Sequence, residues 1–514
     1  MSNITDNRLY QDIVRKHKQI YWIGLVLAIS TCMLFNMSLT NDVWFMISHA
    51  RHMLADGFYP GTDVLSLHEN FDFVYQKWAM CFLSYFVYEN FGRAGLYAGC
   101  YVLYGLFNAS LYVLLNKLNP KSLFCNLPLV LLVSLCSATY MNFRPHVIAG
   151  ILIIWEIYVL EQYVSCHMKT FWFYVQMFVI SLVLMWFHST MWYMVLIPVL
   201  PYLFDGMIHL SRVTAATHSR LPLVLSFPAM IFAACLQPNG LYQFKYMYVC
   251  LTAAGEKYSH IDELAPFYET KLYVVGMIAM LIFGLVVVWH NKRVLLRSLY
   301  WVFGAVLMSV VSGRLMFYGF IFMAVAYASD MREYWVRGDY KHPTNHMLYE
   351  CIYTTAFTLV VLLLSFDICS DYFKPEHIGT YEGIYDGLYI IETMNDNLDM
   401  DGLRLFTTSE VGSYSTIYGA KPYYDCRAEV YDKALNHQSD VIVEFVDVCH
   451  DMADGAFSVE DAKAFQEKYD FDYWILSKDI LRAGPVLEEA GAVCNHPAGD
   501  DKHAVYSFKH TDRF

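Results

Sequence analysis

Repeated apolar runs long enough to cross a membrane constrain this sequence more than any other feature. The first run, Ile20 to Leu39, has about 20 residues, which is enough to span a hydrocarbon core of about 30 Å. Basic residues precede it, and no small-x-small cleavage site follows it, so we predict a retained signal anchor. Only 16 % of the residues are charged. Most of this chain is therefore expected to lie in a membrane, which excludes an ordinary soluble protein.

Ten further apolar runs predict about eleven transmembrane helices in all. Roughly twice as many Lys and Arg residues fall on the expected inner side as on the outer side, which places the N-terminus in the cytoplasm. An odd number of spans then places the C-terminal part outside the plasma membrane. The further spans are expected at Ala94 to Leu115, Ser122 to Tyr140, His146 to Val164, Phe171 to Phe187, Met191 to Phe204, Leu221 to Leu236, Tyr273 to His290, Leu299 to Val311, Leu315 to Ser329 and Met347 to Phe366.

The distribution of charge divides the chain after the last run. Residues 1–366 carry 23 Lys and Arg against 19 Asp and Glu, whereas residues 367–514 carry 12 against 29. We predict an all-α polytopic membrane domain followed by an exported, acidic α/β domain. Its negative field excludes nucleic acid as a partner. In the tail, strands are expected at Leu403 to Thr408, Tyr473 to Ser477 and Val505 to Phe508, and a helix capped by Ser458 at Val459 to Lys468.

Two outer loops, residues 41–93 and 237–271, are too polar and aromatic to be simple connectors. In the first loop, Trp78 to Asn90 is apolar but too short to span, so we predict an interfacial helix there. The 13 cysteines include no C-x-x-C pair, so the sequence indicates neither a zinc site nor a redox site. Disulfides among the tail cysteines stay open.

The densest group of chemically active residues follows the first span. Asp42 lies at the membrane boundary, where a carboxylate needs solvation or a partner. Asn41 and Asp42 could simply cap a new helix, and Asp63 could simply stabilise a turn. The same loop contains Trp44, His49, His52, Lys77 and Trp78, which we take as candidate substrate-binding residues.

The layout of this loop resembles that of the GT-C superfamily, multi-span glycosyltransferases that use polyprenyl-phosphate-linked sugars. The resemblance comprises an early Asp42, then Gly57, Pro60 and Asp63, and then a short apolar helix before the next span. Arg144-Pro145-His146, Gly313-Arg314 and the tail segments from Ser409 to Tyr414 and Tyr424 to Tyr431 are similar to those of uncharacterised bacterial members. The Asp-Glu and Glu-x-x-Tyr patterns of the best-studied branches are absent, which leaves the acceptor open.

The resemblance implies transfer of a sugar from a polyprenyl-phosphate donor to an exported glycan, lipid or protein, with inversion. Asp42 would then take the proton of the acceptor hydroxyl, and Asp63 would orient acceptor or donor. Cationic or hydrogen-bonding groups at the outer ends of later spans should hold the donor phosphate. These are Arg144, His146, His188 and Arg314, for which snorkelling arginines and a satisfied core histidine are the alternatives.

The second outer loop contains His260, Asp262 and Glu263, which we expect to close over the sugar or to hold a metal. A solvated polar loop is the alternative, and no metal or other cofactor is predicted, although a divalent metal stays open. A non-catalytic transporter or handling protein for lipid-linked glycans is the competing function. Candidate residues that gather at one membrane face rather than at mid-membrane favour the enzyme.

Overall fold

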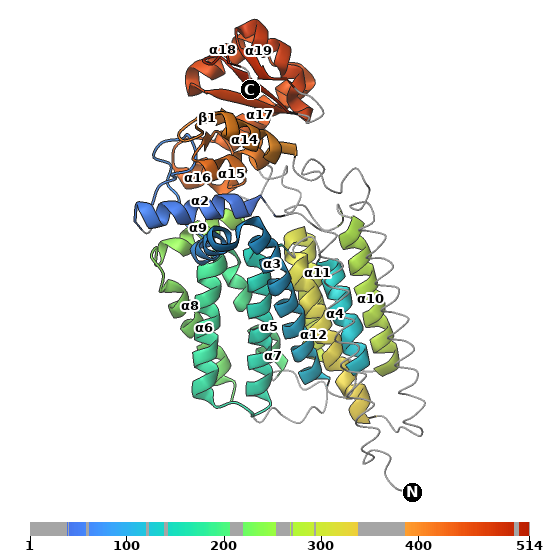
Figure 1. The fold of residues 1–514 in the computed structure, drawn as a ribbon. Coiled ribbons are helices and arrows are strands. Elements are labelled where there is room, and N and C mark those ends of the chain that lie inside the picture. The colour runs from blue at the N-terminus through green and yellow to red at the C-terminus, as the bar shows by residue number, and fades with distance from the viewer. Residues whose placement is uncertain are drawn as a thin grey trace. The chain divides into compact units, whose positions relative to one another are not determined.

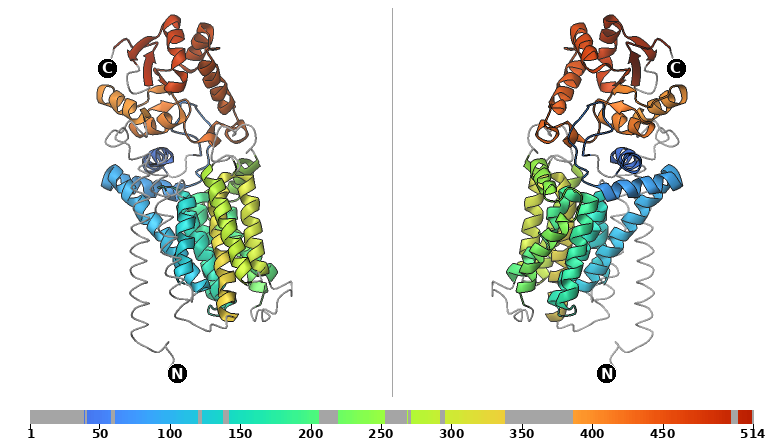
Figure 2. Two further views of the ribbon diagram at one scale, coloured as in Figure 1. Left: turned by 90° about the vertical axis from the view of Figure 1, so that its right-hand side faces the viewer. Right: turned by 90° about the vertical axis from the view of Figure 1, so that its left-hand side faces the viewer.

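The computed structural model describes residues 39, 41–57, 61–119, 123–137, 142–205, 219–252, 268, 271–291, 295–337, 386–497 and 503–512. The chain forms two compact units. The helical unit comprises Met1–Met37, Tyr97–Gln237 and Ser259–Asp371, and the loop–tail unit comprises Ser38–Leu96, Pro238–Tyr258 and Tyr372–Phe514. Figures 1 and 2 show a mostly helical chain with one small sheet near the C-terminus. The predicted spans at Ile20 to Leu39 and Met347 to Phe366 lie almost entirely outside the described residues.

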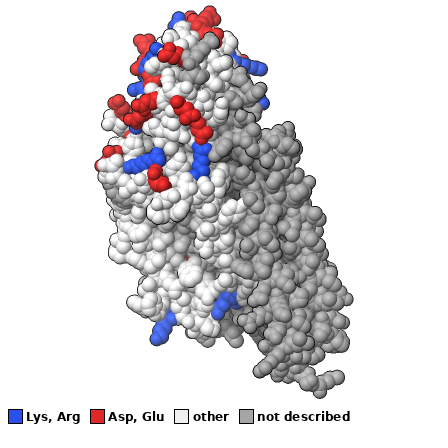
Figure 3. All heavy atoms as spheres, viewed as in Figure 1, with Lys and Arg blue, Asp and Glu red and all other residues white. Residues whose placement is uncertain are grey.

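The helical unit consists of apolar helices that pack side by side, and its charged residues are few on the face seen in Figure 3. Within the described residues, three segments are long and apolar enough to cross a membrane, which are Trp78–Leu118, Pro145–Val164 and Thr170–Phe204. The count of eleven spans stays a prediction. The helices are the later part of α3 (Trp78–Leu118), α4 (Leu123–Cys136), α5 (Pro145–Val164), α6 (Thr170–His188), η3 (Ser189–Val195), α7 (Val199–Asp205), α8 (Leu221–Cys235), α10 (Lys271–Asn291), α11 (Leu296–Val311) and α12 (Gly313–Arg337).

Helix α3 contains a sharp change of direction at Gly92. This residue has φ 60° and ψ −156°, which lies outside the helical region and is open to glycine alone. The chain therefore forms one helix before Gly92 and another after it. The break separates the predicted short helix, Trp78 to Asn90, from the predicted span, Ala94 to Leu115.

The loop–tail unit is built around a mixed five-stranded sheet with the strand order β2-β1-β3-β5-β4. Strands β2, β1 and β3 run parallel to one another, and β5 runs antiparallel to both β3 and β4. The predicted strand Tyr473 to Ser477 is confirmed as β3. The strands are β1 (Arg404–Phe406), β2 (Lys421–Pro422), β3 (Tyr473–Ser477), β4 (Val493–His496) and β5 (His503–Ser507).

Helices cover this sheet and connect its strands. The predicted helix at Val459 is confirmed as α18, with a capping box in which the hydroxyl of Ser458 and the carboxylate of Asp461 each bind the other residue's backbone N–H. The other helices of the unit are α2 (Asp42–Ala55), α9 (Tyr242–Thr252), α14 (Asp386–Asn397), α15 (Ser409–Ser415), η9 (Thr416–Tyr418), η10 (Ala428–Tyr431), α16 (Lys433–Asn436), α17 (Val441–Asp454), η11 (Lys478–Ala483) and α19 (Gly484–Ala490).

Helix α2 is a core element of the loop–tail unit. Eight consecutive residues from Val43 to Ala50 are buried, which gives the helix almost no solvent-facing side over its first two turns. The hydroxyl of Ser48 lies 2.9 Å from that of Thr416 in η9, so the contact joins the first loop to the tail. The loop and the tail therefore share one core. Among the described residues, Cys426, Cys449 and Cys494 carry free thiols.

Candidate functional site

Asp42 is the first residue of helix α2. The preceding Asn41 makes no side-chain capping hydrogen bond, so the capping alternative is not seen for that residue. One carboxylate oxygen of Asp42 lies 3.4 Å from the Nζ atom of Lys77, and the two side chains are 20 % and 17 % exposed. The Lys77 ammonium also lies 4.7 Å from the centroid of the Phe45 ring. The carboxylate is thus partly shielded from solvent and faces a positive charge.

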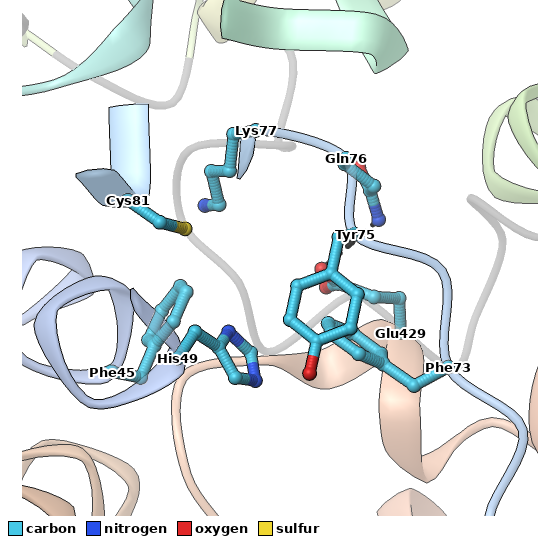
Figure 4. Close-up of a pocket in the computed structure, with 8 residues that line it drawn as sticks. All are labelled: Phe45, His49, Phe73, Tyr75, Gln76, Lys77, Cys81 and Glu429. Atoms are coloured by element: carbon cyan, nitrogen blue, oxygen red, sulfur yellow. Dashed lines mark hydrogen bonds between the residues drawn. The ribbon is translucent and has the colours of Figure 1, made fainter. Parts of the chain in front are cut away.

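A small pocket opens beside this ion pair, within the loop–tail unit (Figure 4). Figure 4 shows Lys77 and Cys81 on one side of it and the carboxylate of Glu429 with Gln76 on the other. Its cavity volume is about 10 Å³, close to the space one water molecule needs. The lining residues are Phe45, His49, Phe73, Tyr75, Gln76, Lys77, Cys81 and Glu429.

Glu429 comes from the tail and was not among the candidates that the sequence indicated. The Nε2 amide of Gln76 donates one hydrogen bond to Oε1 of Glu429 at 3.0 Å and another to the hydroxyl of Tyr246 at 3.1 Å. Burial raises the pKa of the Glu429 carboxyl, and the nearby Lys77 ammonium opposes that effect in part. Glu429 lies in the tail segment Tyr424 to Tyr431 that carries part of the family resemblance, but its contact with Gln76, 353 positions earlier in the chain, could not be predicted from the sequence.

Behind the pocket, Asp63 belongs to a fully buried ionic cluster. Its carboxylate accepts hydrogen bonds from the backbone N–H of Ser66 at 3.0 Å and from the Ser66 hydroxyl at 2.5 Å. The guanidinium of Arg427 donates to the same carboxylate, and to Asp425 at 2.6 Å. The side chains of Asp63, Asp425 and Arg427 are all 0 % exposed.

The electrostatics of this cluster follow from its burial. Burial alone would raise the pKa of Asp63, but the Arg427 guanidinium and the Ser66 hydroxyl outweigh that effect and hold it far below its usual range. For His49, burial and Arg427 both lower the pKa well below 6.5, so the imidazole is neutral. Its Nε2 atom accepts from Arg427 at 3.1 Å. The contacts of Asp63 with Ser66 and Arg427 are those expected if Asp63 stabilises a turn. Its catalytic role stays a prediction.

The other candidates of the first loop are spread around α2. Trp44 is buried, and its ring meets the ring of Tyr414 edge to face with the centroids 4.9 Å apart. His52 lies at the other end of α2, where its Nδ1 atom is 3.0 Å from the carboxylate of Asp56. Trp78 is the first residue of α3. Thus the structure brings His49 and Lys77 to the pocket, but not His52.

In the helical unit, two of the predicted phosphate-binding residues are in direct contact. The Nε2 atoms of His146 and His188 lie 3.3 Å apart, and both side chains are buried. His146 is in the first turn of α5 and His188 is the last residue of α6. The hydroxyl of Thr190 lies 3.2 Å from the Nδ1 atom of His188.

The two predicted arginines lie at helix N-termini in the same unit. Arg144 is the N-cap residue of α5, and Arg314 is the second residue of α12. The Cα of Gly150 in α5 is so close to Phe317 in α12 that an added Cβ would lie 2.7 Å from the ring. Gly150 lies in the second turn of α5 and Phe317 in the second turn of α12, so the two helices touch near their N-terminal ends, which carry a partial positive charge. Such an arrangement suits an anion.

The second-loop candidates His260, Asp262 and Glu263 lie outside the described residues. In the part of the chain that the structure describes, no group of three or more His, Cys, Asp or Glu residues could hold a metal ion. The alternative of a divalent metal therefore stays open.

Comparison with known proteins identifies the fold. No protein-family model and no curated protein matches the chain. Among solved structures, it is similar to the oligosaccharyltransferase of Archaeoglobus fulgidus tethered through a disulfide bond to an acceptor peptide containing the NVT sequon, with a TM-score of 0.59 and 12 % identity over 93 % of this chain and 73 % of that one. The chain is also similar to the apo form of the same enzyme, with a TM-score of 0.56 and 12 % identity over 92 % of this chain and 73 % of that one.

This likeness extends over both units and supports the GT-C-like fold that the sequence resemblance implies. Together with the apolar helices, it agrees with a membrane protein that carries a small sheet domain. At 12 % identity the comparison establishes a shared fold.

Proposed function

We propose that this protein is a membrane glycosyltransferase of the GT-C type. It moves a sugar from a polyprenyl-phosphate donor to an exported glycan, lipid or protein at the outer face of a bacterial plasma membrane. The observation that carries this proposal is the fold, which matches an oligosaccharyltransferase over 93 % of the chain. That enzyme was captured with an acceptor peptide, which supports an exported acceptor here as well.

Asp42 is the proposed general base. Its contact with Lys77 favours the anionic carboxylate, the form that can accept a proton. In the proposed step the acceptor oxygen forms a bond to the anomeric carbon while its proton passes to Asp42. The bond from that carbon to the carrier phosphate breaks, and the phosphate leaves with the electron pair. Attack from the face opposite the leaving group inverts the anomeric centre.

Arg144, His146, His188 and Arg314 are the proposed donor-phosphate residues. Guanidinium groups hold phosphate oxygens through charge-assisted hydrogen bonds, and the N-termini of α5 and α12 add a favourable field. The contact between His146 and His188 supports a common role for these two side chains. Stabilising the departing phosphate in this way lowers the barrier for transfer.

The remaining sequence candidates complete the proposal as substrate-binding residues. Lys77 and His49 line the pocket beside Asp42, whereas Trp44, His52 and Trp78 flank α2 and the start of α3. The His260, Asp262 and Glu263 segment is proposed to close over the sugar. In this proposal the N-terminus is cytoplasmic and residues 367–514 are extracytoplasmic.

The decisive experiment measures carrier release by the purified full-length protein in lipid nanodiscs with a panel of polyprenyl-phosphate sugars. Asp42→Asn should slow transfer by about 10²- to 10⁴-fold, because it removes a general base. Asp447→Asn, the same substitution on the exposed face of α17, is the matched control and should transfer at the wild-type rate. Equal release by Asp42→Asn and wild type would remove Asp42 as the base.

The donor site is tested in the same assay. Arg144→Gln should raise the donor concentration needed for half-maximal rate by about 10-fold or more, since a charge-assisted hydrogen bond is lost. Arg220→Gln, an exposed arginine at the start of α8, is the control. If the wild type released no carrier from any donor, the non-catalytic handling of lipid-linked glycans would replace the enzyme.

A further inference from the structure

Helix α9 of the second loop has two unlike faces. On one of them, Tyr246 is buried. It packs against Val74 of the first loop and Leu435 of the tail, and its hydroxyl accepts a hydrogen bond from Gln76 at 3.1 Å. This face is therefore part of the core of the loop–tail unit, and it holds α9 against the loop that contains Asp42.

The other face of α9 consists of large exposed side chains. Leu241, Lys245 and Tyr248 are spaced by four and three residues, so they follow one side of the helix. Leu241 is 73 % exposed, Tyr248 is 67 % exposed, and Tyr242 beside them is 41 % exposed. We call these four residues the α9 stripe, in which Lys245 carries the one charge. Exposed apolar and aromatic side chains that gather in this way mark an interaction surface.

The preceding helix indicates what the α9 stripe meets. Helix α8 is apolar and exposes large side chains along its length, from Leu221 through Phe232 to Leu236, as expected for a helix that faces lipid. At its C-terminal end, the indole N–H of Trp186 donates to the carbonyl oxygen of Leu236 at 3.3 Å. Tryptophan is enriched where apolar helices reach the membrane surface. Four residues separate Leu236 from Leu241, so the chain covers at most about 18 Å before the α9 stripe begins.

We propose that the α9 stripe is a membrane-contact surface, which lies among the lipid headgroups of the outer leaflet. Leu241 and Tyr248 reach the boundary between headgroups and acyl chains, where interfacial helices bury their aliphatic and aromatic side chains. The ammonium of Lys245, 5.7 Å from the centroid of the Tyr242 ring, contacts lipid phosphates. Because the opposite face of α9 binds the first loop, the lipid contact keeps that loop at the surface where a lipid-linked donor arrives.

Photo-crosslinking of the full-length protein in lipid nanodiscs identifies what meets the α9 stripe. The photoreactive amino acid p-benzoylphenylalanine replaces Tyr248, and mass spectrometry of the protein identifies the captured group. Phospholipid adducts should form several-fold more often than with the same amino acid at Val443, an exposed apolar residue of α17. Leu241 is a second test position. All three side chains are exposed, so the melting temperature of each variant should equal that of wild type.

The lysine of the α9 stripe gives a second, independent readout. In nanodiscs of phosphatidylcholine and phosphatidylglycerol, the adducts at position 248 should be enriched in the anionic lipid by about 2- to 5-fold, the effect of one lysine near an anionic surface. Lys245→Gln should remove this enrichment and leave the total yield of lipid adducts unchanged. The matched control is Lys463, an exposed lysine of α18, and Lys463→Gln should keep the enrichment.

Adducts that join two copies of the chain, or that join α9 to residues 253–270 of its own chain, would show that protein covers the α9 stripe and would overturn the membrane contact. Equal yields of lipid adducts at Tyr248 and Val443 would overturn it as well. Adducts that keep their anionic enrichment in Lys245→Gln would contradict the contact of Lys245 with lipid phosphates. None of these readouts requires sugar transfer, so a failed transfer assay leaves the membrane contact standing, and a failed crosslinking assay leaves the proposed transferase standing.

Discussion

Arg427 is the residue on which the inside of the loop–tail unit depends most. Its guanidinium is fully buried, contacts Asp63, Asp425 and His49, and lies 5.6 Å from the centroid of the Phe73 ring. A buried charge is tolerated only when partners of opposite charge surround it. Here the partners come from α2, from the first loop and from the tail, so one side chain joins three parts of the sequence.

Arg427→Met should lower the free energy of unfolding by about 3–5 kcal/mol, because it leaves two carboxylates buried without their cation. The measurement is denaturant unfolding of the full-length protein in detergent, followed by tryptophan fluorescence. Arg482 is an exposed arginine of η11, and Arg482→Gln should change the free energy of unfolding by no more than about 0.5 kcal/mol. Adding Asp63→Asn to Arg427→Met should recover part of the loss. Equal stability of Arg427→Met and wild type would contradict this account.

At the scale of single elements, α3 depends on Gly92. Positive φ with an extended ψ costs little for glycine but is strained for any residue with a Cβ atom. An added Cβ at Gly92 would meet nothing within 4 Å, so a substitution there tests the backbone alone. An added Cβ at Gly105 would likewise meet nothing within 4 Å. Unlike Gly92, however, Gly105 has helical backbone angles.

These two glycines give an internally controlled prediction. Gly92→Ala should destabilise the protein by about 1–3 kcal/mol, through backbone strain. Gly105→Ala should have no effect or stabilise by up to about 1 kcal/mol, since alanine favours helix. Thermal unfolding of both variants in the same detergent compares them. A Gly92→Ala variant as stable as Gly105→Ala would show that the change of direction at Gly92 is not required.

At the scale of the whole molecule, the loop–tail unit is assembled from segments far apart in the chain. The first loop and the tail share the Ser48 to Thr416 contact, the Gln76 to Glu429 hydrogen bond and the Arg427 cluster. Contacts between residues more than 350 positions apart therefore fix the position of the first loop, which contains Asp42, against the tail. The tail alone lacks these partners.

A tail expressed alone as residues 386–514 should therefore fail to reach a unique fold, because Arg427 and Glu429 would lose their first-loop contacts. Its amide NMR spectrum should be poorly dispersed. A fusion of residues 41–91 to the same tail through a flexible linker should restore dispersion. Well-resolved spectra of the tail alone would contradict the shared core that we describe.

The elements that the sequence predicts well are those whose signal is local. The apolar run at His146 and the buried-strand pattern at Tyr473 agree with α5 and β3, and Ser458 caps its helix as expected. The expected span from Met191 to Phe204 is instead a 3₁₀ helix and a short α-helix, since Pro198 and Pro201 interrupt regular hydrogen bonding.

The candidate site was predictable only in part. Asp42, Lys77 and His49 stand in one dense segment, which local reading can find. The buried partner of Asp63 and the second carboxylate at the pocket could not be found in this way, because Arg427 and Glu429 meet the first loop only after long-range folding. In a tail that mixes many charged residues, Arg427 and Glu429 look like ordinary solvent-exposed charges until their first-loop partners are known.

The loop–tail unit combines early, middle and late segments of the chain, and this has a consequence for the order in which it can form during synthesis. The ribosome finishes the segment around Asp42 early, but Arg427 and Glu429 emerge only after most of the polypeptide has been inserted. Until then, Asp63 and His49 lack their buried cation, and the surroundings of Asp42 are incomplete. A chain that ends before Asp425 would therefore lack the buried cation of Asp63 and the carboxylate that binds Gln76.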